Sequence, residues 1–300
     1  MFTQRPPWRV APVALRHAVA AIGRAPVVSC RDVHGGMTPG PAAVLGLADG
    51  RSVFVKAVPE SAPGSYRAYR REALALAALP RAAPAPELVG TAGAEGWFAL
   101  VMSVAPGTAA GPPWSDDGTR LVGEACAVAG GLRAPDALPR IGELLTDLDG
   151  WDRLAGLDDW EREHVATLAG HAQGWRDWTA GKFLVHQDVR GDNALVDVAA
   201  GRATLVDWSF ACAGASWLDR ARLAADLVAA GHRDGPAAAL RAAGEVLSGL
   251  PEGASRFVVA LAGMWRYRST LPPLPGLPGL RDWQAARARA LRPLLARLIR

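Results

Sequence analysis

Two short apolar segments in the middle of the chain are each followed closely by polar side chains. Residues 183–185 and 204–206 are the apolar segments, and a third one, residues 194–198, leads into a turn at Gly201. Short apolar runs bounded by turn residues are typical of buried strands, so this stretch predicts a strand, a loop and a β-hairpin. Loops at strand ends often carry the functional groups of a protein. The polar side chains found there are His186, Asp188, Asn193 and Asp207.

Apolar positions nearer the N-terminus predict one helix followed by a small antiparallel sheet. Residues 12–23 have apolar side chains at helical spacing. The apolar pattern is typical of strands at residues 27–33, 42–47 and 52–58, and a tight turn at residues 49–50 joins the last two of these strands.

A glycine-bearing loop connects the first two of these strands. Residues 34–40 have the sequence HGGMTPG, which includes Gly35, Gly36, Thr38 and Gly40. Glycine allows backbone N–H groups to approach phosphate oxygens closely, so the loop is a candidate phosphate-binding element. An ordinary hairpin loop is the alternative.

Lys56 lies inside the third apolar strand, where an unpaired ammonium group would be costly. Glu72, in a helix predicted over residues 66–79, is the expected partner, and a surface position on that helix is the alternative. Only Lys56 and Lys182 are lysine among the 33 basic residues. A lysine in such an arginine-rich chain suggests a position that needs a compact point charge.

A buried strand over residues 97–101 precedes a proposed hinge at residues 103–107. A resemblance carried by residues 186–193 and 205–208, described below, implies that backbone groups of Met102 and Val104 bind adenine and that the Met102 side chain lines the adenine pocket; a plain core position is the alternative for Met102. Helices are predicted beyond the hinge, over residues 119–132, 163–178, 219–227, 236–248, 254–268 and 281–300.

The order of acidic and amide side chains around the hairpin fits phosphoryl transfer. In that chemistry one carboxylate accepts the proton of a substrate hydroxyl, while an amide and a second carboxylate bind Mg²⁺. Asp188 would be the proton acceptor, and Asn193 and Asp207 would be the metal ligands. An ordinary hairpin with polar ends is the alternative.

The same residues resemble a known family. HQDVRGDN at residues 186–193 and LVDW at residues 205–208 resemble the catalytic and metal-binding loops of the aminoglycoside phosphotransferase and choline kinase family, whose members are relatives of protein kinases. The resemblance implies an α+β, bilobal, protein-kinase-like fold. The N-terminal nucleotide-binding lobe, residues 1–102, would hold an antiparallel sheet and one main helix. A larger, mostly helical lobe, residues 108–300, would carry the catalytic hairpin and the acceptor site.

The resemblance also implies roles for single residues. The loop at residues 34–40 would cover the ATP phosphates, Lys56 would contact the α- and β-phosphates, and Glu72 would fix the lysine ammonium group. Arg190 would contact the γ-phosphate or pair with Asp192. Asp219 would hold the catalytic loop by hydrogen bonds, with a simple helix-start acid as the alternative.

Composition narrows the classes of partner. The chain has 300 residues, 50% of them hydrophobic, and a net charge of +4. Basic residues are scattered and no aromatic-interleaved basic patch is present, which argues against a nucleic-acid partner. No apolar run of transmembrane length and no signal-peptide pattern occur, so we expect a cytoplasmic protein without a membrane partner. Cys30, Cys126 and Cys212 are expected to be buried, reduced thiols.

We therefore expect a small-molecule kinase that uses Mg²⁺ and ATP to phosphorylate a hydroxyl group. A catalytically silent nucleotide-binding regulator on the same fold is the alternative, and the oligomeric state is open. Residues 143–163 hold eight acidic residues and two arginines, a pattern that usually means exposed helix faces; a cationic acceptor is the functional alternative that it favours. The basic C-terminus, residues 291–300, argues against an aminoglycoside. The acceptor class stays open among four candidates: an amino alcohol, a sugar, an amino acid, or an antibiotic, which would mean a role in resistance.

Overall fold

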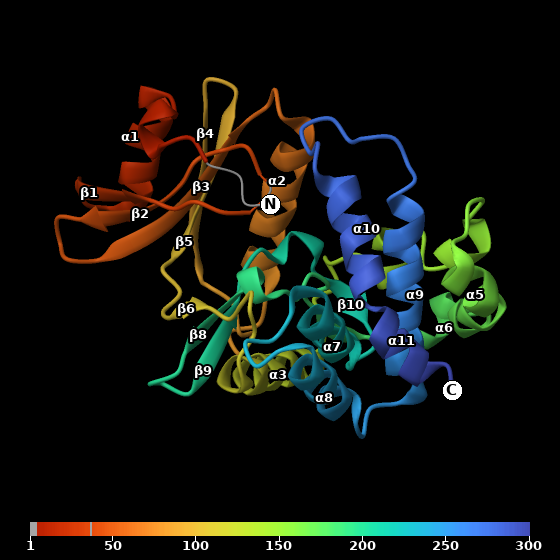
Figure 1. Ribbon diagram of the computed structural model, residues 1–300. Coiled ribbons are helices and arrows are strands. Elements are labelled where there is room, and N and C mark those ends of the chain that lie inside the picture. The colour runs from red at the N-terminus through yellow and green to blue at the C-terminus, as the bar shows by residue number, and fades with distance from the viewer. Residues whose placement is uncertain (1–4, 37) are drawn as a thin grey trace.

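A computed structural model describes residues 5–36 and 38–300 of the chain. Residues 1–4, at the start of the proposed first lobe, and Met37, in the glycine-bearing loop, lie outside the described residues. The N-terminal sheet has five antiparallel strands in the order β1-β2-β3-β5-β4 (Figure 1). They are β1 (Val27–Asp32), β2 (Ala42–Leu47), β3 (Ser52–Pro59), β4 (Leu88–Ala94) and β5 (Trp97–Ser103).

Two helices pack against this sheet. Helix α1 (Val13–Gly23) contacts β4 and β5, and its Leu15 and Val19 are fully buried among apolar strand residues. Helix α2 (Pro63–Ala78) contacts β3 and β5 and also the 3₁₀ helix η4 (Trp208–Phe210). Because η4 directly follows Asp207, α2 connects the sheet to the polar hairpin region of the second half of the chain.

The hairpin region contains the predicted strand, β7, and the predicted hairpin of β8 and β9, and two further strands complete two small sheets. Strand β8 pairs with both β6 and β9, and strand β7 pairs with β10. The bounds are β6 (Thr108–Ala109), β7 (Phe183–Val185), β8 (Ala194–Asp197), β9 (Arg202–Leu205) and β10 (Cys212–Gly214).

The second half of the chain is otherwise mostly helical. Helices α7 and α9 form its centre, because they are buried on most sides and contact each other as well as neighbouring helices (Figure 1). The helices are α3 (Asp116–Gly131), α4 (Ile141–Leu144), α5 (Asp159–Ala172), α6 (Trp175–Trp178), α7 (Leu218–Ala230), α8 (Pro236–Leu247), α9 (Glu252–Arg268), α10 (Leu280–Ala290) and α11 (Arg292–Leu298). Three further 3₁₀ helices are η1 (Trp8–Val10), η2 (Gly150–Arg153) and η3 (Gly191–Asn193).

Two helices predicted as continuous are interrupted. The segment 163–178 is divided between α5 and α6, because Gly174 lies between them with a φ of 67° that ends regular helix geometry. The segment 281–300 is divided between α10 and α11, and Pro293 lies in the first turn of α11, where a missing N–H group is tolerated.

One prediction about the cysteines is wrong. Cys126 and Cys212 are buried free thiols, but Cys30 is an exposed one. Cys30 belongs to β1, which is an edge strand whose side chains are almost all exposed.

The helices of the described residues are all too short or too polar to cross a membrane.

Candidate active site

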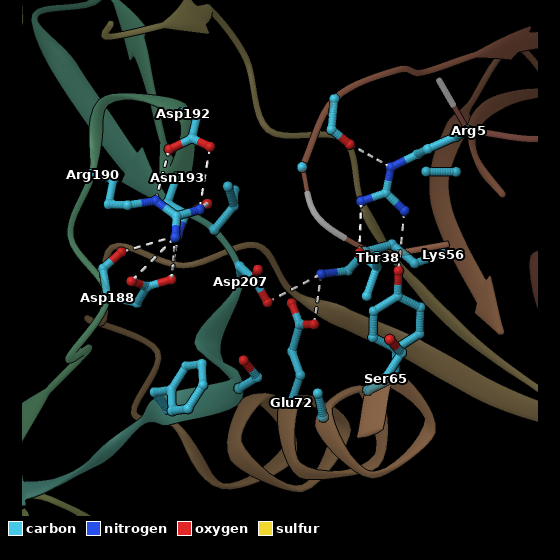
Figure 2. Close-up of a pocket in the computed structure, with 18 of the residues that line it drawn as sticks. Arg5, Thr38, Lys56, Ser65, Glu72, Asp188, Arg190, Asp192, Asn193 and Asp207 are labelled. Atoms are coloured by element: carbon cyan, nitrogen blue, oxygen red, sulfur yellow. Dashed lines mark hydrogen bonds and ion pairs between the residues drawn. The ribbon is translucent and has the colours of Figure 1, made fainter. Parts of the chain in front are cut away.

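A cavity of about 1210 Å³ lies between the N-terminal sheet, helix α2 and the loops of the hairpin region. It is lined by every residue that the sequence nominated for catalysis, metal binding or nucleotide binding, with the exception of Gly40. Figure 2 shows how side chains from both halves of the chain point toward one another across it. Residues separated by up to about half of the chain therefore share one site.

Lys56 pairs with two carboxylates in this cavity. Its Nζ lies 2.6 Å from Glu72 Oε2 and 3.6 Å from Asp207 Oδ1 (Figure 2). Burial by itself would lower the pKa of Lys56, but the Asp207 and Glu72 carboxylates raise it above its ordinary value. Lys56 is therefore a fixed ammonium group, and the predicted pairing with Glu72 is present.

The loop of residues 186–193, the candidate catalytic loop, holds Asp188 in a network of its own residues. Asn193 Nδ2 donates to Asp188 Oδ2 at 2.8 Å and to the Asp188 carbonyl at 3.0 Å. Arg190 Nη1 lies 3.2 Å from Asp188 Oδ2, and Arg190 Nε donates to Asp192 Oδ1 at 2.9 Å. Arg190 thus pairs with both neighbouring acids. Burial raises the pKa of Asp188 to about 6 against the opposing effect of the Arg190 and Arg222 cations.

His186 is a structural member of this loop. Its Nδ1 accepts from the Asp188 N–H at 3.2 Å, so the ring proton resides on Nε2, which donates to the Val206 carbonyl at 2.9 Å. Burial lowers the pKa of His186, which keeps the ring neutral. The ring therefore connects the loop of Asp188 to the loop of Asp207.

Asp219 and Asp226 anchor the two ends of the catalytic loop. Asp219 accepts the His186 and Gln187 N–H groups at 2.7 and 2.9 Å, and Asp226 accepts the Gly191 N–H at 3.0 Å. The sequence nominated Asp219 but not Asp226. The two aspartates are seven residues apart on α7, and this helical spacing on one face is the signal that could have found Asp226.

Two oxygen donors are available for a divalent cation. The Val206 N–H donates to the Asn193 carbonyl at 2.8 Å, which places the Asn193 and Asp207 loops side by side. Because Asn193 Nδ2 is bound to Asp188, its Oδ1 is the atom left for a ligand, and it has one long contact of 3.3 Å with Arg190. Burial would raise the pKa of Asp207, but the nearby cations, above all Lys56, hold it below its ordinary value. An amide oxygen and an ionised carboxylate fit Mg²⁺, which prefers hard oxygen ligands.

Gly40 does not line the cavity, and its lack of a side chain has another cause. A Cβ atom at this position would lie 1.8 Å from the Ala57 carbonyl oxygen. Close packing between the backbones of the loop and β3 therefore requires glycine here, rather than the approach to phosphate that the sequence suggested.

The described part of the glycine-bearing loop is held by Arg5, which the sequence did not nominate. Its guanidinium donates to the Gly35 carbonyl at 2.6 Å, Thr38 Oγ1 at 2.9 Å, the Gly40 carbonyl at 3.0 Å and the Tyr69 hydroxyl at 3.2 Å (Figure 2). Gly35 and Gly36 have positive φ angles of 109° and 78°. Nothing in the sequence distinguishes Arg5 from the many other arginines, so only the folded chain reveals it.

Met102, in β5, and Val104, just after this strand, also line the cavity. Met102 is 3% exposed and belongs to the hydrophobic core as well as to the cavity wall, so both interpretations of this residue describe its position. Val104 is 37% exposed. Their contact with adenine stays a prediction.

The acidic segment at residues 143–163 contributes Leu144 and Leu145 to the cavity lining, but not its acidic side chains. Within the described ranges 5–36 and 38–300, none of its carboxylates lines the cavity wall. Several are paired with arginines instead: Asp147 with Arg153 and Arg268, Asp158 with Arg292, and Glu161 with Arg266 and Arg292. Most of the segment thus forms ion pairs on and between helices.

Solved structures with the same fold include several kinases. An aminoglycoside phosphotransferase, a thermostable mutant in ternary complex with ADP and hygromycin B, is 15% identical with a TM-score of 0.59, over 93% of this chain and 99% of that chain. A macrolide 2′-phosphotransferase from Brachybacterium faecium is 17% identical with a TM-score of 0.54, over 90% and 96%. At such identities the likeness shows the fold alone, and it confirms the expected kinase-like α+β architecture.

A third structure, an aminoglycoside phosphotransferase from Streptomyces rimosus in complex with ADP and streptomycin, is 18% identical with a TM-score of 0.55, over 84% and 99% of the two chains. No curated protein matches the chain significantly. The model of the phosphotransferase enzyme family matches residues 42–257, which include the ion pair of Lys56, the catalytic loop and Asp207. The chain therefore belongs to the phosphotransferase enzyme family.

Proposed function

We propose that this protein transfers the γ-phosphoryl group of ATP to a hydroxyl group of a small molecule. The observation that carries the proposal is the single cavity that Asp188 shares with the Lys56–Glu72 ion pair and Asp207. Because they share this cavity, Asp188 as the candidate proton acceptor and Lys56 as the candidate phosphate-binding cation would face the same bound molecules. The solved relatives named above include complexes with ADP, which supports a nucleotide in this cavity.

Asp188 would position the acceptor hydroxyl and accept its proton. The acceptor oxygen forms a bond to the γ-phosphorus, the bond from that phosphorus to the β,γ-bridging oxygen breaks, and ADP leaves with the bond's electron pair. The contacts from Asn193 and Arg190 fix the Asp188 carboxylate so that one oxygen faces the acceptor. Such a positioned base contributes about 10²–10⁴-fold to rate.

The nucleotide would lie along the N-terminal lobe, residues 1–102, beside the hinge at residues 103–107. The Lys56 ammonium would contact the α- and β-phosphates, and the N–H groups of the glycine-bearing loop would cover them. Backbone groups at Met102 and Val104 would bind the adenine. The remaining residues, 108–300, would supply the base and the acceptor site.

Asn193 Oδ1 and the Asp207 carboxylate would hold Mg²⁺. When bound, the ion neutralises charge on the phosphate oxygens of the nucleotide. The anionic state of Asp207, which the neighbouring Lys56 favours, keeps this ligand ready at neutral pH.

A panel of hydroxyl compounds tests the proposal, with release of ADP from Mg·ATP as the signal. We expect at least one acceptor to stimulate release, phosphate to appear on its hydroxyl, and Asp188→Asn to abolish the stimulation. Tight binding of Mg·ATP without acceptor-dependent release across the panel would contradict the proposal and identify a catalytically silent regulator.

A further inference from the structure

The cavity extends past the catalytic loop to a wall formed by α4, α9, α10 and the loop between the last two helices. This wall, called here the acceptor wall, consists of Leu144, Leu145, Met264, Trp265, Leu277 and Trp283. The Cζ atom of Arg190 lies 5.8 Å from the centre of the Trp283 ring, so the wall begins next to the residues that hold Asp188. Trp265 and Trp283 form an edge-to-face pair with ring centres 5.6 Å apart.

The acceptor wall offers apolar surface rather than negative charge. All six of its side chains are apolar or aromatic. Arg268 is the charged residue of α9 that lines the cavity, and its Nε donates to Asp147 at 2.8 Å. Rings and aliphatic side chains bind molecules with apolar faces, and aliphatic side chains do not repay the lost hydration of an ammonium group.

Every carboxylate that lines the cavity, within the part of the chain that the structure describes, already has a cationic partner. The pairs are Glu72 and Asp207 with Lys56, Asp188 and Asp192 with Arg190, and Asp226 with Arg287. A polycation entering the cavity would have to displace these partners. It would also meet Arg222 and Arg268, which line the same space.

The Trp283 ring is not available to a cationic ligand either. Arg287 lies 4.9 Å and Arg190 5.8 Å from its centre, so the attraction of the ring for positive charge is already used. The Trp283 side chain still lines the cavity, where its carbon atoms can pack against a ligand.

From these contacts we propose that the acceptor is an alcohol without positive charge whose carbon framework packs on the acceptor wall. The inference rests on the proposed phosphoryl transfer and names the chemical class of its acceptor. It replaces the cationic acceptor that the acidic segment at residues 143–163 favoured, because none of the carboxylates of that segment lines the cavity and several of them are paired with arginines.

A graded acceptor series tests the class. The probes are naphthyl glucoside, which is neutral with an apolar face; methyl glucoside, which lacks that face; and a polyamino aminocyclitol with its fully N-acetylated form. We expect kcat/KM for naphthyl glucoside to exceed that for methyl glucoside and for the aminocyclitol by about tenfold or more, and N-acetylation to improve the aminocyclitol. A preference for the polyamino compound that N-acetylation removes would overturn the proposed class and leave the phosphotransferase function intact.

Binding is measured in parallel by calorimetry in the presence of Mg²⁺ and a non-hydrolysable ATP analogue. Naphthyl glucoside should bind and the aminocyclitol should not. Absence of turnover with every probe despite this binding pattern would support the acceptor class and count against the proposed function. The reverse binding order would overturn the class whether or not turnover is seen.

Substitutions in the acceptor wall test whether naphthyl glucoside binds there. Trp283→Ala should raise KM for naphthyl glucoside about tenfold and leave KM for ATP unchanged. Trp178→Ala is the matched control, because Trp178 stacks on Trp217 outside the cavity lining. Trp283→Phe keeps an aromatic side chain and should restore most of the affinity for naphthyl glucoside. Comparison of the two variants therefore separates loss of the aromatic contact from a folding defect of Trp283→Ala.

A gain-of-function variant provides the complementary test. Leu277→Glu places an unpaired carboxylate on the half-buried rim of the acceptor wall. We expect it to improve binding of the polyamino aminocyclitol and to weaken binding of naphthyl glucoside. An unchanged order of binding would contradict the proposed placement of the acceptor.

Discussion

The Lys56 ammonium group lies 2.6 Å from the Glu72 carboxylate, which joins strand β3 to helix α2 at the centre of the cavity. This contact keeps a cation in an otherwise apolar strand and aims it at the space where the proposed phosphates lie. Lys56→Ala should raise KM for ATP by about tenfold or more, because it removes a charge-assisted contact from a buried site. Initial rates at varied ATP concentration measure the change.

The chain provides a matched control for this variant. Lys182, the other lysine, is exposed, and Lys182→Ala should leave KM for ATP unchanged. Lys56→Arg should also raise it, because the planar guanidinium does not reproduce a compact ammonium beside Glu72. Equal behaviour of Lys56→Ala and Lys182→Ala would refute the role of Lys56.

Asp188→Asn tests the proposed base. The amide keeps the shape of the side chain but cannot accept the hydroxyl proton, so kcat should fall by about 10²-fold or more while ATP still binds. Asp192→Asn, which alters the other carboxylate paired with Arg190, should cost much less. A loss of less than a few fold in Asp188→Asn, measured with an identified acceptor, would rule out general-base catalysis by this residue.

The pH profile follows from the burial of Asp188. Since burial raises the pKa of Asp188 to about 6, the carboxylate form that accepts a proton is present above that pH and is lost as the pH falls through it. We expect kcat/KM for the acceptor, at saturating Mg·ATP, to fall about tenfold per unit below an apparent pKa of about 6. An acid limb at the ordinary value of an aspartate, about 4, would show that another group controls the rate.

Asp219 is predicted to support both stability and turnover. Asp219→Ala leaves the buried His186 and Gln187 N–H groups without an acceptor, at a cost of about 1–3 kcal/mol each. The free energy of unfolding, measured by urea titration, should fall accordingly, and kcat should fall because the loop of Asp188 is no longer fixed.

Asp197→Ala serves as the control for that measurement, because Asp197 also accepts a backbone N–H, from Ala200, but at an exposed turn. Its effect on unfolding should stay within about 0.5 kcal/mol. If both variants lose the same small amount of stability, the buried bonds of Asp219 are not the anchor that the structure indicates.

Arg5 should support nucleotide binding through the glycine-bearing loop. Its four hydrogen bonds join residues on both sides of the loop to Tyr69 of α2. Arg5→Ala should raise KM for ATP about three- to tenfold with a smaller change in kcat, because the loop then has to be ordered by the nucleotide. Arg9→Ala, an exposed arginine in the same segment, should have no effect, and a null result for both would remove Arg5 from the site.

Much of the site could be predicted because its residues lie in short segments with strong local patterns. The strand, loop and hairpin around Asp188 and Asp207 follow from apolar runs and turn residues, and the ion pair of Lys56 follows from the cost of burying a charge. The interrupted helices and the exposed thiol of Cys30 were not predicted. Helix periodicity does not report where a chain bends, and burial of a strand residue depends on whether its strand is an edge.

The sequence by itself determined the kinase-like order of elements and the identity of the acidic, amide and lysine groups in the cavity, because these depend on neighbours within a few residues. Tertiary structure alone decided that Arg5 holds the glycine-bearing loop, that Asp226 anchors the candidate catalytic loop, and that carboxylates of residues 143–163 pair with arginines instead of lining the cavity. These contacts join residues that are 30 or more positions apart in the sequence. Only the packing of the whole chain brings such residues into contact.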